Sequence, residues 1–201
     1  TLSLHDALPI LSYEEIGEGK LRIGVHIADV SHFVQPGTAL DKAAFERATS
    51  VYLPDRVYPM LPERISNELC SLRPKEEKLT FSATFEVDDA GRIVHTWYGK
   101  TVIYSDRRFT YEDVQEIIET KEGDHKAEIL WLHDYTQNLR KQRFENGAIN
   151  FSSQEVRFTL DATGKPIGIT VKESKASHQL IEELMLKANQ LIRSEEHTSE
   201  L

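Results

Sequence analysis

Apolar and polar residues alternate strictly along residues 79–87, and this period of two constrains the fold more than any other feature of the sequence. The apolar positions are Leu79, Phe81, Ala83, Phe85 and Val87. Residues 88–91, Asp-Asp-Ala-Gly, are typical of a turn, and residues 93–104 return as a second β-rich segment. The pattern predicts an antiparallel hairpin with one face against a hydrophobic core.

Other segments carry weaker signals of both strand and helix. Strands are predicted at Lys20–Val30, Ala148–Phe151, Val156–Leu160 and Ile167–Val171, with a turn at Asp161–Gly164. Helices are predicted at Asp41–Ala48 after a Thr38 cap, from Thr110 through Ile118, at Lys126–Phe144 before Gly147, and at Ser177–Leu191. The expected fold class is therefore α+β, a mixed sheet with packed helices.

Prolines interrupt the chain between residues 51 and 74, where Pro54, Pro59, Pro62 and Pro74 exclude long regular elements. Glu63–Leu69 can still hold about two helical turns. The lone Cys70 lies in an apolar stretch, so we expect a small buried side chain without a disulfide partner.

The formal net charge of −9 taken alone argues against a nucleic-acid binder, because phosphate contacts need Lys and Arg. Basic residues nevertheless cluster at residues 107–108 and 140–143, and an enclosed channel draws on local charge, so net charge decides little. No apolar run approaches the roughly 20 residues that cross a bilayer, and no basic leader precedes one. We expect a cytoplasmic protein that does not enter a membrane.

No motif with an independent catalytic signature is present. A two-metal nuclease needs converging carboxylates, but the acidic pairs at 76–77 and 88–89 fall in a charged loop and in a hairpin turn. Asp29 ends a strand, where a single aspartate more often caps a turn. Walker, zinc-binding and nucleophile-elbow motifs are also missing. The residues alone therefore predict no catalytic and no metal-binding side chain.

Both ends of the sequence break the pattern of their neighbours. Residues 1–10 have no periodicity that joins the following strand, and residues 193–201 change abruptly from an apolar-striped helix to a polar segment. The strings TLSLHDALPI and RSEEHTSEL resemble translated sequencing-adapter read-through. We therefore expect a non-native head at 1–10, one domain at 11–192 and a non-native tail at 193–201. The alternative is that both ends are native, frayed termini.

Several blocks resemble, in order, the catalytic domain of the RNB family, the RNase II and RNase R exoribonucleases. They are GVHIADVSHFV at 24–34, TSVYLP at 49–54, PMLP at 59–62, ISNELCSL at 65–72, GAINF at 147–151 and LIEELMLKAN at 180–189. The first and fourth blocks are nearer to RNase R than to RNase II. The resemblance covers nearly all of residues 11–192 and implies a partial RNB catalytic domain.

The resemblance implies an activity for the intact parent: processive, hydrolytic 3′→5′ degradation of single-stranded RNA to nucleoside 5′-monophosphates with Mg²⁺. In the family an acidic motif, D-x-x-x-x-x-D-x-D-D-A, precedes the residues that match Leu11-Ser12-Tyr13. Here Ser3–Ile10 stands in that place, and its Asp6-Ala7 is out of register. We therefore expect this chain to lack the metal-binding aspartates, to bind no Mg²⁺ specifically and to be inactive by itself.

By position, the resemblance assigns four residues to RNA binding. Tyr52 and Phe151 match an aromatic pair that clamps terminal bases, and Tyr111 and Glu182 match residues that grip the nucleotide nearby. Aromatic stacking suits an enzyme that holds unstacked bases without reading sequence. From the sequence alone, core packing of each aromatic and a solvated helix face for Glu182 remain alternatives.

Two other functions stay open. A catalytically dead relative could use the same fold to bind RNA as a scaffold, and a structural α+β domain could have no RNA role. The expected partner is single-stranded RNA, and the expected oligomeric state is a monomer.

Overall fold

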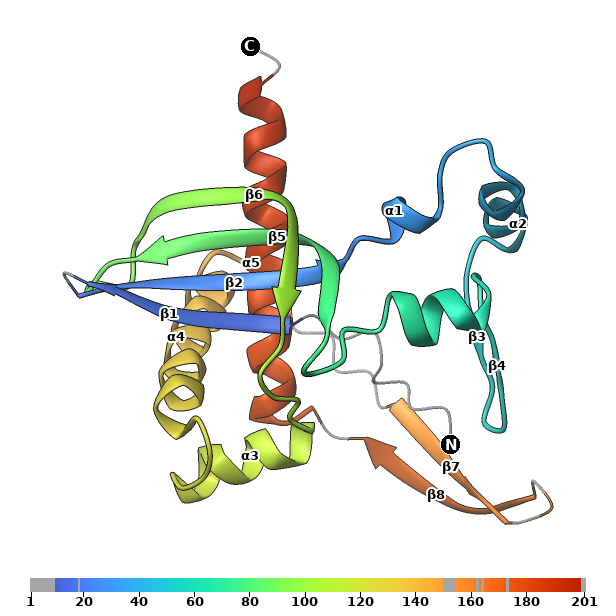
Figure 1. Cartoon of the computed structure of the whole chain (residues 1–201). Helices are drawn as coiled ribbons and strands as arrows, with labels where there is room; N and C mark the ends of the chain where they lie inside the picture. Colours follow the sequence, from blue (N-terminus) through green and yellow to red (C-terminus); the bar gives the residue numbers. More distant parts are fainter. Residues whose placement is uncertain are drawn as a thin grey trace. The chain divides into compact units, whose positions relative to one another are not determined.

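The computed structural model describes residues 10–17, 19–149, 155–161, 163, 165–172 and 174–199 (Figure 1). Helices and antiparallel strands both occur, which confirms the α+β class. The chain divides into two compact units. The larger unit contains residues 10–28, 72–149 and 175–199 of the described part, and the smaller contains residues 29–71 and the described residues between 155 and 174.

A four-stranded antiparallel sheet forms the centre of the larger unit. Its strands are β1 (Ile10–Gly17), β2 (Lys20–Ala28), β5 (Glu77–Val87) and β6 (Ile93–Tyr104), in the order β1-β2-β5-β6. The predicted hairpin is confirmed, and so is the strand predicted from Lys20, but β2 ends at Ala28. The prediction is wrong for residues 29 and 30, because Asp29 caps helix α1 (Val30–Phe33) and Val30 begins that helix. Strand β1 was not predicted, because Glu14 and Glu15 follow each other and break the alternation that Leu11 and Tyr13 begin.

Helices α4 (Lys126–Glu145) and α5 (Ala176–Ser199) pack on one face of this sheet (Figure 1). The face is apolar because alternate strand residues share a side, and the register pairs Ile23 with Phe85 and Val25 with Ala83. The buried core consists of Ile23, Val25, Ala83, Phe85, Val87, Leu132, Tyr135, Leu180, Leu184 and Ala188. Burial raises the pKa of the Tyr135 hydroxyl to about 12.

The capping residues predicted from the sequence set two helix ends. Thr110 and Asp113 form a reciprocal capping box at the start of α3 (Tyr111–Thr120). At the end of α4, Gly147 has φ 93° and donates to the Phe144 carbonyl, while the Ala148 N–H donates to Arg143. Because Ala148 closes the helix, the predicted strand is wrong for residues 148–149, and residues 150–151 lie outside the described part.

Helix α5 continues through Ser199, beyond the predicted end at Leu191. No glycine or proline follows Leu191 to end the helix, and arginine and glutamate are good helix formers. The proposal that residues 193–201 are foreign to the domain stays a prediction. None of the described helices is both long and apolar enough to span a bilayer.

The smaller unit consists of short elements. Its helices are α1 (Val30–Phe33), α2 (Ala39–Arg47) and the π-helix η1 (Arg64–Leu69); its ribbons pair β3 (Val51–Tyr52) with β4 (Val57–Tyr58) and β7 (Glu155–Leu160) with β8 (Pro166–Lys172). Thr38 caps α2 as predicted, and η1 occupies the segment predicted to hold two helical turns. Cys70 is buried, as expected. Asp29 caps α1 by accepting from the His32 N–H, which is the structural role favoured for it.

Candidate nucleic-acid interface

Tyr52 lies on the surface of the β3–β4 ribbon. It pairs with Val57, and its side chain is 59% exposed, so the core alternative is wrong for this residue. Arg47 ties α2 to the segment after the ribbon by donating to the Pro59 carbonyl at 3.0 Å. Because the Tyr52 side chain is largely exposed, its ring is accessible for stacking on a base. Phe151, its predicted partner in the clamp, lies outside the described residues.

Tyr111 is the first residue of α3 in the larger unit, and its ring is half-buried. It stacks on His178 at the start of α5, with ring centroids 4.1 Å apart and an interplanar angle of 10°. Burial raises the pKa of the Tyr111 hydroxyl. A phenol is already protonated at neutral pH at its ordinary pKa of about 10, so Tyr111 can donate a hydrogen bond there.

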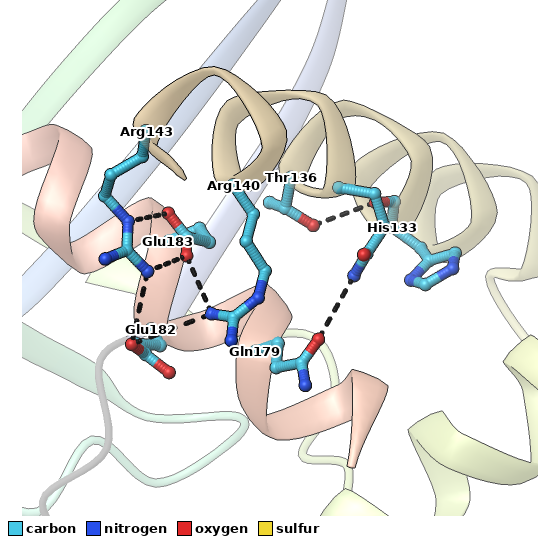
Figure 2. A network of polar contacts seen from close by, with 8 residues as sticks. His133, Thr136, Arg140, Arg143, Gln179, Glu182 and Glu183 are labelled. Atoms are coloured by element: carbon cyan, nitrogen blue, oxygen red, sulfur yellow. Dashed lines mark hydrogen bonds and ion pairs between the residues drawn. The ribbon is translucent and has the colours of Figure 1, made fainter. Parts of the chain in front are cut away.

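Glu182 and Glu183 take different environments on consecutive positions of α5 (Figure 2). Glu182 is half-exposed, and its carboxylate lies 3.7 Å from Arg143 and 4.0 Å from Arg140. Glu183 is only 3% exposed. Its Oε1 accepts from Arg140 at 3.1 Å and from Arg143 at 2.5 Å, while its Oε2 accepts from Arg143 at 3.1 Å.

Arg140 and Arg143 project from α4 toward these carboxylates (Figure 2). Each guanidinium also lies about 5 Å from the ring centre of Phe144, and the hydrogen bond to Glu183 raises the pKa of Arg143 above its usual value. The basic cluster seen in the sequence is therefore largely an ion-pair network between two helices. Its two arginines hold α5 against α4.

The Arg107–Arg108 cluster is also drawn into the protein's own contacts. The Arg107 guanidinium pairs with Asp124 at 2.8 Å and lies over the Phe109 ring. Predicting RNA contacts from basic sequence clusters therefore overestimates the cationic surface of this chain.

A histidine and several hydroxyls form a polar layer on the sheet face opposite the core. The Nδ1 of His26 lies 2.6 Å from the Ser82 hydroxyl, and its Nε2 lies 2.9 Å from the Ser12 hydroxyl. Ser82 continues the chain of contacts to Thr101. A Cβ at Gly24 would lie 2.6 Å from His26 Nε2, so only glycine leaves room for this ring.

The burial of His26 predicts acid sensitivity. Desolvation lowers its pKa in the folded protein, so the unfolded state binds the proton more readily. The contribution of neutral His26 to the free energy of unfolding should be fully present above the unfolded-state pKa of about 6.5. It should be lost as the pH falls through the lower pKa of His26 in the folded protein. Urea unfolding between pH 7.5 and roughly pH 5 measures this loss.

Two variants test the assignment of that pH dependence. His26→Gln removes the titrating group from the buried layer and should flatten the stability profile below about pH 6.5. His95→Gln removes an exposed histidine from β6 and should leave the profile unchanged. An unchanged slope in His26→Gln would assign the acid sensitivity to other groups.

Sequence reasoning missed Glu183, His178 and His26. The pattern did contain a signal for Glu183, because it stands three residues after Leu180 on the stripe that Leu184 and Ala188 continue. A carboxylate in a buried stripe needs a cationic partner. The partners lie 40 and 43 residues away on α4, which no local pattern reveals.

A sequence model of the RNB domain matches residues 2–198. The chain belongs to the RNB family. DIS3-like exonuclease 2 of Xenopus tropicalis is 41% identical over 201 residues, covering 90% of this chain and 24% of that protein. Ribonuclease R of Thermotoga maritima is 40% identical over 188 residues, covering 90% of this chain and 26% of that protein.

A solved RNB-family structure agrees with the fold. Mycoplasma genitalium RNase R, in complex with ribose-methylated single-stranded RNA, superposes with a TM-score of 0.88 and 28% identity. The match covers 100% of this chain and 32% of the RNase R chain. The chain therefore spans about a quarter of the curated relatives named above and about a third of this structure. It is a partial RNB fold, as the resemblance implied.

Proposed function

We propose that this chain is a segment of a hydrolytic 3′→5′ exoribonuclease of the RNase R type, which degrades single-stranded RNA processively to nucleoside 5′-monophosphates. Membership of the RNB family, established by the match over residues 2–198, carries the proposal. The likeness to an RNase R solved with single-stranded RNA supports the substrate class. We further propose that the parent is a cytoplasmic monomer.

The contribution of this segment is to hold RNA. The exposed ring of Tyr52 suits stacking on a base, and the half-exposed Glu182 carboxylate can accept hydrogen bonds from ribose hydroxyls. Tyr111 adds a protonated phenol on the helix that packs beside α5. We assign Phe151 to the clamp from its place in the matched GAINF block.

The described residues do not fit a two-metal centre. Within that part of the chain, no group of three or more His, Cys, Asp or Glu side chains could hold a metal ion. Two-metal phosphodiester hydrolysis requires several converging carboxylates. We propose that Mg²⁺ acts in the longer protein through an acidic motif before Leu11, and we assign no catalytic step to the residues of this chain.

The proposal predicts that the purified 201-residue chain binds RNA without degrading it. Fluorescence anisotropy with a 5′-labelled oligoadenylate should show saturable binding, while chromatography of the same mixture with Mg²⁺ should show no released mononucleotide. Mononucleotide release that EDTA abolishes would contradict the expected inactivity. Absence of RNA binding at low salt, where phosphate contacts are strongest, would contradict the RNA-holding role.

The coding sequence upstream of Leu11 distinguishes an interrupted enzyme from a catalytically dead RNA-binding relative. Sequencing the DNA upstream of the Leu11 codon should reveal an intact D-x-D-D-A motif in frame. A native upstream sequence without that motif would favour the scaffold function, because the RNA-holding side chains would remain while the metal ligands would not.

A further inference from the structure

The starts of α3 and α5 are joined by two neighbouring contacts. The Tyr111 and His178 rings stack in parallel at 4.1 Å, and the Gln115 side-chain oxygen accepts from the Ser177 N–H at 3.1 Å. Tyr111 and Gln115 are four residues apart and therefore lie on one face of α3. This face sets where the first turn of α5 lies.

His178 also connects the two RNA-binding residues predicted in the larger unit. Its ring contacts Tyr111 directly, and Glu182 follows it by four residues, one turn further along the same face of α5. Arg143 of α4 contacts the next turn of α5, where it pairs with both Glu182 and Glu183. The stack and the ion pairs thus fix the same two turns of α5 from α3 and from α4.

We propose that His178 is a positioning residue for RNA binding, whose imidazole holds the Tyr111 ring in the orientation that grips the nucleotide beside Glu182. The inference rests on the proposed function and adds to it a residue that was not among the predicted contacts. A tyrosine ring has two rotatable side-chain torsions, and a parallel partner removes most of that freedom before RNA arrives. Pre-ordering a contact group strengthens binding without any new contact to the ligand.

His178 has a second role that the test must separate from stacking. Its Nδ1 accepts from the Lys175 N–H at 3.4 Å, in the turn that begins α5. Phenylalanine keeps a ring but has no acceptor, whereas asparagine keeps an acceptor but has no ring. The pair His178→Phe and His178→Asn therefore distinguishes a platform for Tyr111 from a helix-capping group.

The experiment compares both variants with the unmodified 201-residue chain, using anisotropy of a 5′-fluorescein-labelled oligoadenylate. His178→Asn should weaken binding about three- to tenfold, which corresponds to the worth of one aromatic pair. His178→Phe should bind within about twofold of the unmodified chain by the same reasoning. Ring-current shifts of the Tyr111 protons, measured by NMR, should persist in His178→Phe and disappear in His178→Asn.

The outcomes separate this inference from the function on which it rests. If the unmodified chain does not bind RNA, the proposed function fails and this inference fails with it. If the chain binds and His178→Asn binds equally well, only the role of His178 is overturned. RNA affinity that is kept in His178→Asn but lost in His178→Phe would also overturn it, because the hydrogen-bond acceptor rather than the ring would then matter.

Discussion

Replacing Glu183 with glutamine should lower the free energy of unfolding by about 3 kcal/mol, the lower end of the cost of breaking a buried ion pair. Glu183 is buried and accepts three hydrogen bonds from Arg140 and Arg143. A neutral amide leaves two guanidinium groups without their main counter-charge. The nearby Glu182 carboxylate and partial exposure of both arginines keep the loss from being larger. Urea denaturation measures it.

Glu182→Gln is the matched control, since it makes the same chemical change one residue earlier on α5. Its longer ion pairs and half-exposed carboxylate predict a loss below about 1 kcal/mol. Glu182→Gln should nevertheless weaken RNA binding, because it removes a proposed contact to RNA. The loss of affinity should be larger than the small loss of folding stability accounts for. Equal destabilisation by the two substitutions would show that the network does not divide into a structural and a binding carboxylate.

The division between Glu182 and Glu183 also bears on the proposed binding of RNA. The arginines are occupied by Glu183, so they contribute little free positive charge to a phosphate backbone. Binding by this segment should therefore depend on stacking and on contacts to ribose more than on ion pairs. A shallow dependence of affinity on salt concentration is the physical consequence.

Local patterns predicted most of the secondary structure, because hairpin alternation and helix capping are properties of a few neighbouring residues. The turn after Val87 and the caps at Thr38, Thr110 and Gly147 all lie where the sequence placed them. Strand β1 escaped prediction because its alternation is short. The extension of α5 escaped because residues 193–201 lack the apolar stripe on which the helix was predicted, although no glycine or proline ends the helix there.

The candidate site was less predictable, since its geometry depends on contacts between distant segments. The His26 layer joins β1, β2, β5 and β6, and the stack of Tyr111 on His178 crosses 67 positions of sequence. A residue's type indicated possible chemistry, but only the fold showed that Glu183 is buried while Glu182 is accessible. The four candidate RNA-binding residues came from the family resemblance and not from local patterns.

In the exoribonuclease that we propose carries this segment, Tyr52→Ala should weaken binding of the RNA 3′ end by about 1–3 kcal/mol, the worth of one lost stack. Phe151→Ala should have a similar effect if the two rings clamp the terminal bases. Because Tyr52 is exposed, its truncation should leave the melting temperature nearly unchanged. Fewer stacks release the shortening RNA earlier, so the limit product should grow by one or more nucleotides.

Tyr58→Ala is the control from the same ribbon. Tyr58 is 55% exposed and pairs with Val51, so it is about as accessible as Tyr52 but points to the opposite side of the ribbon. It should change neither affinity nor product length. Tyr52→Leu completes the test, since leucine keeps an apolar side chain but cannot stack on a base. If Tyr52 clamps the RNA, this variant should be stable and should still release longer limit products. Unchanged product length in both Tyr52 variants would remove Tyr52 from the clamp and leave a surface residue of the ribbon.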